Sequence, residues 1–449
     1  MSGSKTPSWG IEPVPDRLRA LGALDTGLLW GSLGMSLLVV VAGVLLVPAL
    51  SLRDALAAIL VGAVLGNLML ALAATIGADA RVPGMVLLRA PLGRHGSYLA
   101  TAVNVAQNVG WTIFELIVIA TAASALSQRA FGWSGRWAWT LVAAAITTVL
   151  ALIGPVTFVH QWVRKVAIWV VLASLVYLTW WALDGAALHA LWSRPGKGGL
   201  SFWAGVDLTI AMPVSWLPLV ADYTRFSRSR GASFAGTFVG YLVPNAWLYA
   251  LGALLLLSRG LADAPSLITA IAGAGAGAGL ALVALGIDET KEPFANVYSA
   301  AVSIQNLLPR VPQRALICLV AAGSTAGALA IDLTRYQSFL YLLGSVFVPL
   351  FGVLLADWLL AGAHYTREDV FGAPALRPGL LAAWVAGFCL YQWLQPVGPA
   401  WWTSLVARTH PHALPWGGAS LPSFGAALVL ALVLGTAARR LATPRPQRA

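Results

Sequence analysis

Long apolar runs alternate with short polar segments along most of the chain. A run of about 20 apolar residues is long enough to cross a bilayer as a helix. The pattern predicts an all-α polytopic membrane protein of about twelve transmembrane helices. We expect the spans near residues 24–48, 54–76, 97–124, 136–157, 165–184, 204–222, 234–257, 276–308, 314–332, 336–358, 377–395 and 420–438.

The eighth of these runs contains a dense group of charges within the segment LGIDETKEPFANVYS, residues 285–299. Two interpretations compete: a polar loop between two short spans, or the middle of one long, interrupted helix. Ionisable groups at membrane depth are costly and usually mark a substrate or ion path. The second interpretation would therefore be a statement about function. The charged residues of the group are Asp288, Glu289, Lys291 and Glu292.

The distribution of basic residues separates the two interpretations, because cytoplasmic loops carry an excess of Lys and Arg. With twelve spans, 19 of the 28 basic residues fall on the side of the N-terminus and 8 on the other, with Lys291 in the membrane. If the charged group were a loop, the division would be 14 against 14. We therefore predict a protein of the cell (inner) membrane with twelve spans and with Lys291 inside the membrane. The tails at residues 1–22 and 439–449 are predicted to be cytoplasmic.

Three of the predicted spans contain features that interrupt helices. The first has Gly34 and Ser36 within a glycine- and serine-containing stretch, the sixth has Pro213 and Pro218, and the eighth has Pro293. Gly and Pro are common in membrane helices, but interruptions at corresponding positions of two halves indicate an inverted-repeat transporter with a midplane site. We predict a first repeat at residues 23–185, a second at 203–360, and two additional spans at 376–438.

Polar residues form a stripe on the third predicted span. Asn104, Asn108, Trp111 and Glu115 are spaced four, three and four apart and share one helical face, and Gln107 lies one turn before Trp111. Such a stripe must face the interior of a helix bundle. It can serve as hydrogen-bonding contact between helices or as a binding surface, and the lone carboxylate favours binding because it needs a partner or a proton.

Composition agrees with a membrane protein and excludes some classes. Hydrophobic residues make up 59% of the chain and charged residues 10%. The net charge of +11 comes from basic residues scattered between apolar runs, so we expect no nucleic-acid partner. The polar N-terminus has no signal-peptide core, and Cys318 and Cys389 indicate neither a disulfide nor a metal site.

Several segments of the chain resemble one transporter family. They are NVAQNVGW (104–111), WLPLVADYTRFSRS (216–229), ANVYSAAVSIQNL (295–307) and FLYLLGSVFVPLFGVLLADWLL (339–360). These segments are similar to the nucleobase–cation symport family of cytosine, purine, allantoin and hydantoin permeases, most closely its cytosine permease and hydroxymethylpyrimidine-transporter branch. The resemblance covers roughly residues 23–365. It implies the leucine-transporter fold, with two inverted five-span repeats, two extra spans and alternating access.

The resemblance also implies roles for particular residues. Trp111 matches the tryptophan on which the family stacks a flat heterocycle, and Glu115 falls where members place a polar substrate-binding side chain. Ser215 and Trp216 match the break of the sixth span, although the opposing aromatic is offset here by a few residues. Asn296 lies where the family uses an asparagine for the polar edge of the ring. A flat heterocycle needs faces for stacking and edge groups for hydrogen bonds, which these side chains offer.

One departure from the family concerns the coupling cation, which is H⁺ or Na⁺. Sodium-coupled members offer small hydroxyl residues about one and a half turns before the asparagine, where this chain has Thr290 and Lys291. An ammonium group would compete with sodium, so we hypothesise that Lys291 titrates instead, with Asp288, Glu292 or Glu115. A permanently salt-bridged or snorkelling Lys291 is the alternative. Gly34 and Ser36, at the predicted break of the first span, complete the candidate coupling residues.

We therefore expect a secondary transporter that imports cytosine, another pyrimidine, hydroxymethylpyrimidine or a purine across the lipid membrane. The candidate substrate residues are Gln107, Asn108, Trp111, Glu115, Ser215, Trp216 and Asn296. No catalytic residue, cofactor, metal or obligate protein partner is expected. An integral membrane enzyme using Asp288, Glu289 and Glu292, or a non-transporting sensor, is the alternative.

Overall fold

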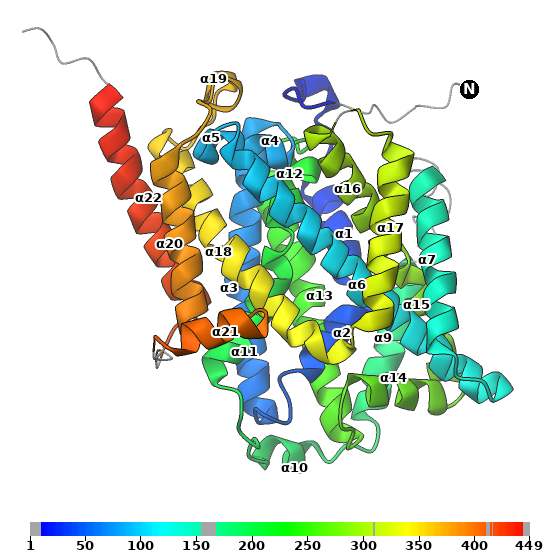
Figure 1. Cartoon of the computed structure of the whole chain (residues 1–449). Helices are drawn as coiled ribbons and strands as arrows, with labels where there is room; N and C mark the ends of the chain where they lie inside the picture. Colours follow the sequence, from blue (N-terminus) through cyan, green and yellow to red (C-terminus); the bar gives the residue numbers. More distant parts are fainter. Residues whose placement is uncertain (1–9, 154–167, 309, 410–413, 415, 443–449) are drawn as a thin grey trace, which may run out of the picture.

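The computed structural model describes residues 10–153, 168–308, 310–409, 414 and 416–442, and the regular structure in these ranges is almost entirely helical. Figure 1 shows the helices packed side by side in one bundle. The first half contains η1 (Asp16–Leu18), α1 (Ala23–Gly34), α2 (Leu37–Val44), α3 (Leu52–Ala80), α4 (Gly84–Leu87), α5 (Arg89–Leu92), α6 (Gly96–Phe131), α7 (Arg136–Ile153), α9 (Ile168–Leu183) and α10 (Leu188–Ser193).

The second half begins with α11 (Phe202–Val214) and α12 (Leu217–Thr224), which pack against α3 of the first half. It continues with α13 (Arg230–Ser258), α14 (Ala264–Gly273), α15 (Ala276–Glu289), α16 (Lys291–Leu307), α17 (Gln313–Ala330), η3 (Leu333–Arg335), α18 (Tyr336–Leu360), α19 (Arg367–Phe371), α20 (Pro378–Leu394), α21 (Ala400–Ala407) and α22 (Ser420–Ala442). The all-helical fold class predicted from the sequence is thereby confirmed.

Among the described residues, eight helices are long and apolar enough to cross a membrane, and the bent pair α1–α2 makes a ninth. The eight are Leu52–Ala80, Gly96–Phe131, Arg136–Ile153, Phe202–Thr224, Arg230–Ser258, Gln313–Ala330, Leu333–Leu360 and Ser420–Arg439. Shorter apolar helices occupy other predicted spans, namely α9 and α20. The number twelve stays a prediction, because the adjoining ends of the predicted spans 136–157 and 165–184 lie partly outside the described residues.

The predicted eighth span corresponds to α15 and α16, which meet at Thr290. The segment before it is not part of the span, because α14 is a separate helix and Gly275 separates it from α15 with φ +117°. Only glycine adopts that backbone angle without strain. The charged residues 288–292 therefore lie at the junction of two helices rather than in a long connecting loop.

The first span is broken, as its glycines and serines predict. α1 ends at Gly34, Met35 and Ser36 are extended, and α2 continues at an angle of 60°. The Ser36 hydroxyl accepts a hydrogen bond from the Leu38 amide at 3.0 Å, which satisfies one of the free N–H groups at the start of α2. The break therefore has a stable local structure.

The sixth span is interrupted more mildly. α11 ends and α12 begins around Ser215 and Trp216, with Pro213 and Pro218 on either side. Each proline lacks an N–H group and clashes with the preceding turn, which frees backbone carbonyls near the interruption. The two helices still form one apolar span, Phe202–Thr224.

Close helix packing holds the first break in the interior. A Cβ atom at Gly43 would collide with the Tyr249 carbonyl of α13, and one at Gly252 would collide with the Val40 carbonyl of α2. Small residues of this kind let two membrane helices approach through their backbones. Every residue of α2 is buried as a result.

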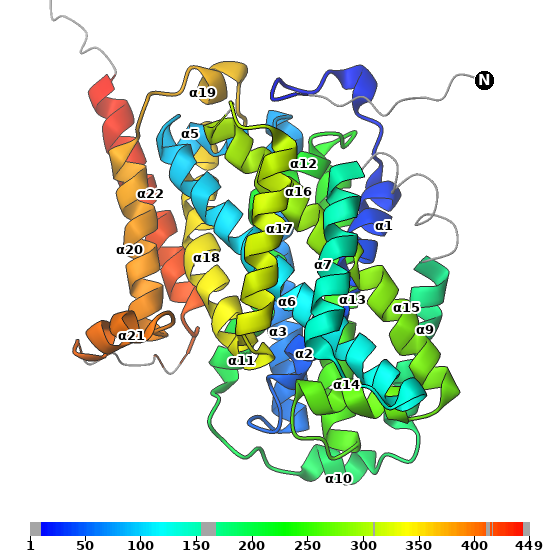
Figure 2. The same ribbon diagram turned by 45° about the vertical axis from the view of Figure 1, so that its right-hand side comes forward.

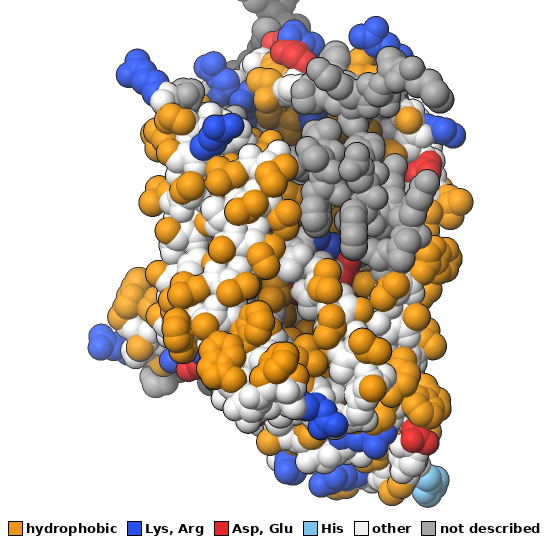
Figure 3. Space-filling model, turned by 90° about the vertical axis from the view of Figure 1, so that its right-hand side faces the viewer, with side chains coloured by type: hydrophobic (Ala, Val, Ile, Leu, Met, Phe, Trp, Pro, Cys, Tyr) orange, Lys and Arg blue, Asp and Glu red, His pale blue; other side chains and the backbone are white. Residues whose placement is uncertain are grey.

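Both described ends of the chain lie at the same end of the bundle. η1, α19 and the C-terminal end of α22 lie at one end, and α10 lies at the opposite end (Figures 1 and 2). On the face in Figure 3, hydrophobic side chains cover the middle, and Lys and Arg lie mostly toward the two ends. Exposed apolar residues such as Trp169 and Leu319, each 67% exposed, suit contact with lipid.

Candidate functional site at the interrupted helices

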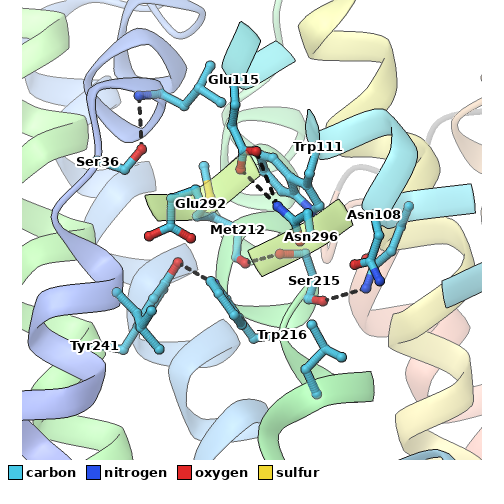
Figure 4. Close-up of a pocket in the computed structure, with 14 residues that line it drawn as sticks. Ser36, Asn108, Trp111, Glu115, Met212, Ser215, Trp216, Tyr241, Glu292 and Asn296 are labelled. Atoms are coloured by element: carbon cyan, nitrogen blue, oxygen red, sulfur yellow. Dashed lines mark hydrogen bonds between the residues drawn. The ribbon is translucent and has the colours of Figure 1, made fainter. Parts of the chain in front are cut away.

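A cleft lies where the breaks of the first and sixth spans face α6, α13 and α16 (Figure 4). The empty space of the cleft, including the part that is open to solvent, is about 450 Å³. Helix breaks leave backbone groups free, and such breaks are where membrane transporters place their sites. The lining residues are Leu33, Ser36, Leu38, Gln107, Asn108, Trp111, Glu115, Met212, Ser215, Trp216, Leu219, Tyr241, Glu292 and Asn296.

Two tryptophans from different helices contribute aromatic surface to the cleft. Trp111 of α6 packs edge-on against Phe339, with ring centroids 5.2 Å apart. Trp216 at the sixth-span break donates from its indole nitrogen to the Tyr241 hydroxyl at 2.9 Å. Packing and the hydrogen bond fix both rings, so the cleft offers rigid apolar faces of the kind that stack with planar ligands.

A carboxylate and an amide meet across the cleft. The Asn296 side-chain nitrogen donates to both carboxyl oxygens of Glu115, at 3.0 and 3.2 Å. The two residues are 9% and 4% exposed, so the pair is buried between α16 and α6. The hydrogen bonds offset part of the cost of burying a carboxyl group.

Two other amides of α6 are incompletely paired. Gln107 donates to the Ser215 carbonyl at 3.1 Å, but its oxygen has no hydrogen-bond partner among the described residues. Asn108 is fully buried, and neither its oxygen nor its nitrogen has a partner there. Buried polar groups are nearly always paired, so these atoms are available to a polar ligand.

The junction of α15 and α16 binds both ends of the first-span break. Glu289 accepts from the Ser36 hydroxyl at 2.8 Å and from the Leu37 amide at 2.7 Å, at the N-terminus of α2. Lys291 donates to the Ser32 carbonyl at 3.1 Å, near the C-terminus of α1, and to Asp288 at 2.7 Å. Each charge thus meets the helix end of opposite polarity.

All seven predicted substrate residues line this one cleft, which the sequence could place only on separate spans. Ser36 and Glu292 of the predicted coupling group also line it. The other four do not: Lys291 and Asp288 pair beside the break, the Thr290 hydroxyl donates to the Ile287 carbonyl, and Gly34 lies against Pro244. No group of three or more His, Cys, Asp or Glu side chains could hold a metal within the described ranges.

Six residues of the site had no substrate or coupling role in the sequence prediction: Leu33, Leu38, Met212, Leu219 and Tyr241, which line the cleft, and Glu289, which contacts Ser36. Tyr241 and Met212 lie in apolar spans with nothing to distinguish them from packing residues. Glu289 was considered only as part of an enzyme site. A signal was present, because Glu289, Glu292 and Asn296 are spaced three and four apart and so share one helical face.

Comparison with known proteins places this architecture in a family. A family model described as "Permease for cytosine/purines, uracil, thiamine, allantoin" matches residues 13–371. The chain belongs to this family. The match confirms the resemblance to the nucleobase–cation symport family, and its members are transporters rather than enzymes. The alternative of a membrane enzyme using Asp288, Glu289 and Glu292 is therefore wrong.

The similar relatives are distant in sequence. The allantoin permease of Bacillus subtilis is 24% identical over 65% of this chain and 65% of its own length, so this chain spans slightly less than two thirds of it. The cytosine permease of Escherichia coli K12 is 22% identical over 78% of this chain and 81% of its own length. The hydantoin permease of Microbacterium maritypicum is also 22% identical, over 76% and 73%.

Solved structures confirm the fold. The inward-facing conformation of Mhp1 matches with a TM-score of 0.79 and 18% identity, covering 96% of this chain and 92% of that one. Mhp1 in a closed conformation with bromovinylhydantoin bound matches with a TM-score of 0.73 and 18% identity, covering 97% and 96%. MhsT in complex with L-phenylalanine matches with a TM-score of 0.54 and 14% identity, covering 92% of this chain and 98% of that one. The chain thus has the leucine-transporter fold of a multi-pass membrane protein.

Proposed function

We propose that this transporter imports a flat nitrogen heterocycle by alternating access, with both chain termini in the cytoplasm. The candidate substrates are cytosine, another pyrimidine, hydroxymethylpyrimidine and a purine. The observation that carries this proposal is the combination of rigid aromatic faces with unpartnered amide groups in one cleft. Trp111 and Trp216 would contact the faces of the ring, while Asn108, Gln107 and the Glu115–Asn296 pair would bind its edge.

We further propose that protons, not sodium ions, drive uptake. Carbonyl groups at the C-terminal end of a broken helix are the groups that hold a coupling cation in transporters of this kind. Here the Lys291 ammonium group already lies 3.1 Å from one such carbonyl, that of Ser32. A positive charge at this point opposes Na⁺ binding. The same lysine can exchange a proton with a neighbouring carboxyl group, which a coupling proton requires.

The test is uptake of labelled cytosine into proteoliposomes under an imposed proton gradient or an imposed sodium gradient. We expect the wild-type chain to use the proton gradient, and the variant Lys291→Ala to lose that response. Lys197→Ala is the matched control, because Lys197 is an exposed lysine in the connection between α10 and α11. It should retain proton-driven uptake at the wild-type rate.

Two other outcomes would contradict parts of the proposal. Sodium-driven uptake that survives Lys291→Ala would refute proton coupling through this residue and leave it a structural role. Absence of uptake of cytosine, hydroxymethylpyrimidine and purines under either gradient would favour the non-transporting sensor.

A further inference from the structure

Within the residues that the structure describes, one carboxyl group of the cleft is buried with an oxygen that accepts no hydrogen bond. Glu292 is 6% exposed, it lines the cleft, and its Oε1 atom accepts no hydrogen bond from the described residues. Figure 4 shows its side chain beside Trp216 and Tyr241. The indole nitrogen of Trp216 and the hydroxyl of Tyr241 are hydrogen-bonded to each other. A buried carboxyl oxygen without a donor is costly, so this position calls for a partner from outside the chain.

The neighbouring acidic groups have their donors already. Glu289 is bound by Ser36 and Leu37, Asp288 by Lys291, and Glu115 by Asn296. In the part of the chain that the structure describes, Glu292 takes part in no salt bridge. Lys291, the basic group of this cluster, donates its hydrogen bonds to Asp288 and the Ser32 carbonyl. Glu292 is therefore the acidic residue of the group that lines the cleft without a hydrogen bond from the described residues.

An anionic ligand would find little to bind here. In broken-helix transporters the N-terminal end of a half-helix is the part that points at anionic substrate groups. At α2 that end is already occupied, because the Leu37 amide donates to Glu289 and the Leu38 amide donates to Ser36. At the first break, therefore, the cleft favours positive charge and hydrogen-bond donors over negative charge.

We propose that Glu292 determines specificity for heterocycles with an amidine-type edge, in which a ring nitrogen carries a proton beside an exocyclic amino group. This inference rests on the proposed function and names the substrate class of that site. An ionised carboxylate offers only acceptors, so it pairs bidentately with two adjacent donors. The oxo analogue of the same ring replaces the amino donor with a carbonyl acceptor, which the carboxylate repels. The proton on the ring nitrogen enters with the ligand.

Two pairs of compounds of equal ring size test this inference: isocytosine against uracil, and guanine against xanthine. The dissociation constants of all four labelled compounds would be measured on the full chain purified in detergent. In the wild type, the amino member of a pair should bind about 10- to 100-fold more tightly than its oxo partner, as hydrogen bonds to a charged group require. Glu292→Gln should reduce this ratio to near one by weakening the amino member.

Two further variants make the measurement decisive. Glu368→Gln makes the same chemical change at an exposed residue of α19 and should keep the wild-type ratio. Glu292→Asp retains the carboxylate and should keep part of the preference, which separates loss of the group from misfolding. A pair of which neither member binds is set aside, and the other pair decides.

Three outcomes would overturn the inference. Equal or tighter binding of the oxo member by the wild type would do so while leaving the proposed function intact, and a protonated Glu292 would give that result. An unchanged ratio in a folded Glu292→Gln variant would assign the preference elsewhere. Failure of the wild type to bind any of the four compounds, cytosine or hydroxymethylpyrimidine would overturn the proposed function as well.

Discussion

The contact between Glu115 and Asn296 joins two helices that are far apart in the sequence, through a single amide group. Both carboxyl oxygens accept from the same nitrogen, and both residues are nearly buried. A neutral amide does not cancel the charge of a carboxylate, so the pair can orient Glu115 toward the cleft without neutralising it. The pair therefore positions α16 against α6 and presents a carboxyl group to a ligand.

Replacing Glu115 should separate these two roles. Glu115→Ala leaves the buried Asn296 nitrogen without an acceptor, which costs about 1–3 kcal/mol of stability, and it should abolish measurable cytosine binding. Glu115→Gln keeps an oxygen that accepts from Asn296, so it should unfold near the wild-type temperature but bind more weakly. Thermal unfolding in detergent and equilibrium binding measure the two effects. Equal destabilisation by both variants would contradict a role for the hydrogen bond.

At the scale of helices, the junction of α15 and α16 contacts both helix ends at the break between α1 and α2. It offers an ammonium group to the carbonyl end of α1 and a carboxyl group to the amide end of α2. Each contact is favoured by the dipole of the helix end that it meets. If α1 and α2 moved relative to this junction, both sets of contacts would be lost together. The conformation of the first span is therefore coupled to the charge state of the junction.

Ser36 connects the two sides of this arrangement, since it caps α2 and donates to Glu289. Ser36→Ala should lower the free energy of unfolding by about 2 kcal/mol or more, from the lost cap and the lost hydrogen bond to a buried carboxyl group. It should also slow cytosine uptake. Thermal unfolding and initial uptake rates provide the measurement.

Ser51→Ala is the matched control for this change. Ser51 caps α3 in the same way, accepting from the Asp54 amide at 3.0 Å and donating to the Asp54 carboxylate at 2.8 Å, but in an exposed position. Its loss should cost about 1 kcal/mol and leave uptake unchanged. Similar uptake defects in both variants would refute a special role for the first break.

For the whole molecule, the sequence predicted what depends on spacing within a helix and missed what depends on contacts between helices. The stripe from Gln107 to Glu115 was visible because residues three and four apart share a face. The break near Ser36 was visible from its glycines and serines. The partner of Glu289 was not, because Ser36 lies 253 residues away and the contact depends on how two spans pack. The helix α14 was also missed, although the predicted eighth span, 276–308, begins where α15 begins.

The orientation of the bundle in the membrane is the last prediction, and it follows from charge. The asymmetry of 19 basic residues against 8 predicts that the end that carries η1 and α19 lies in the cytoplasm. Single cysteines test this in a background of Cys318→Ala and Cys389→Ala, with Glu368→Cys on α19 and Ser193→Cys on α10, at opposite ends of the bundle (Figure 1). A membrane-impermeant maleimide should label Ser193→Cys on intact cells, and Glu368→Cys only after permeabilisation. The cysteine-free background should remain unlabelled in both conditions. The reverse pattern would place the end that carries η1 and α19 outside and would contradict the orientation predicted from the basic residues.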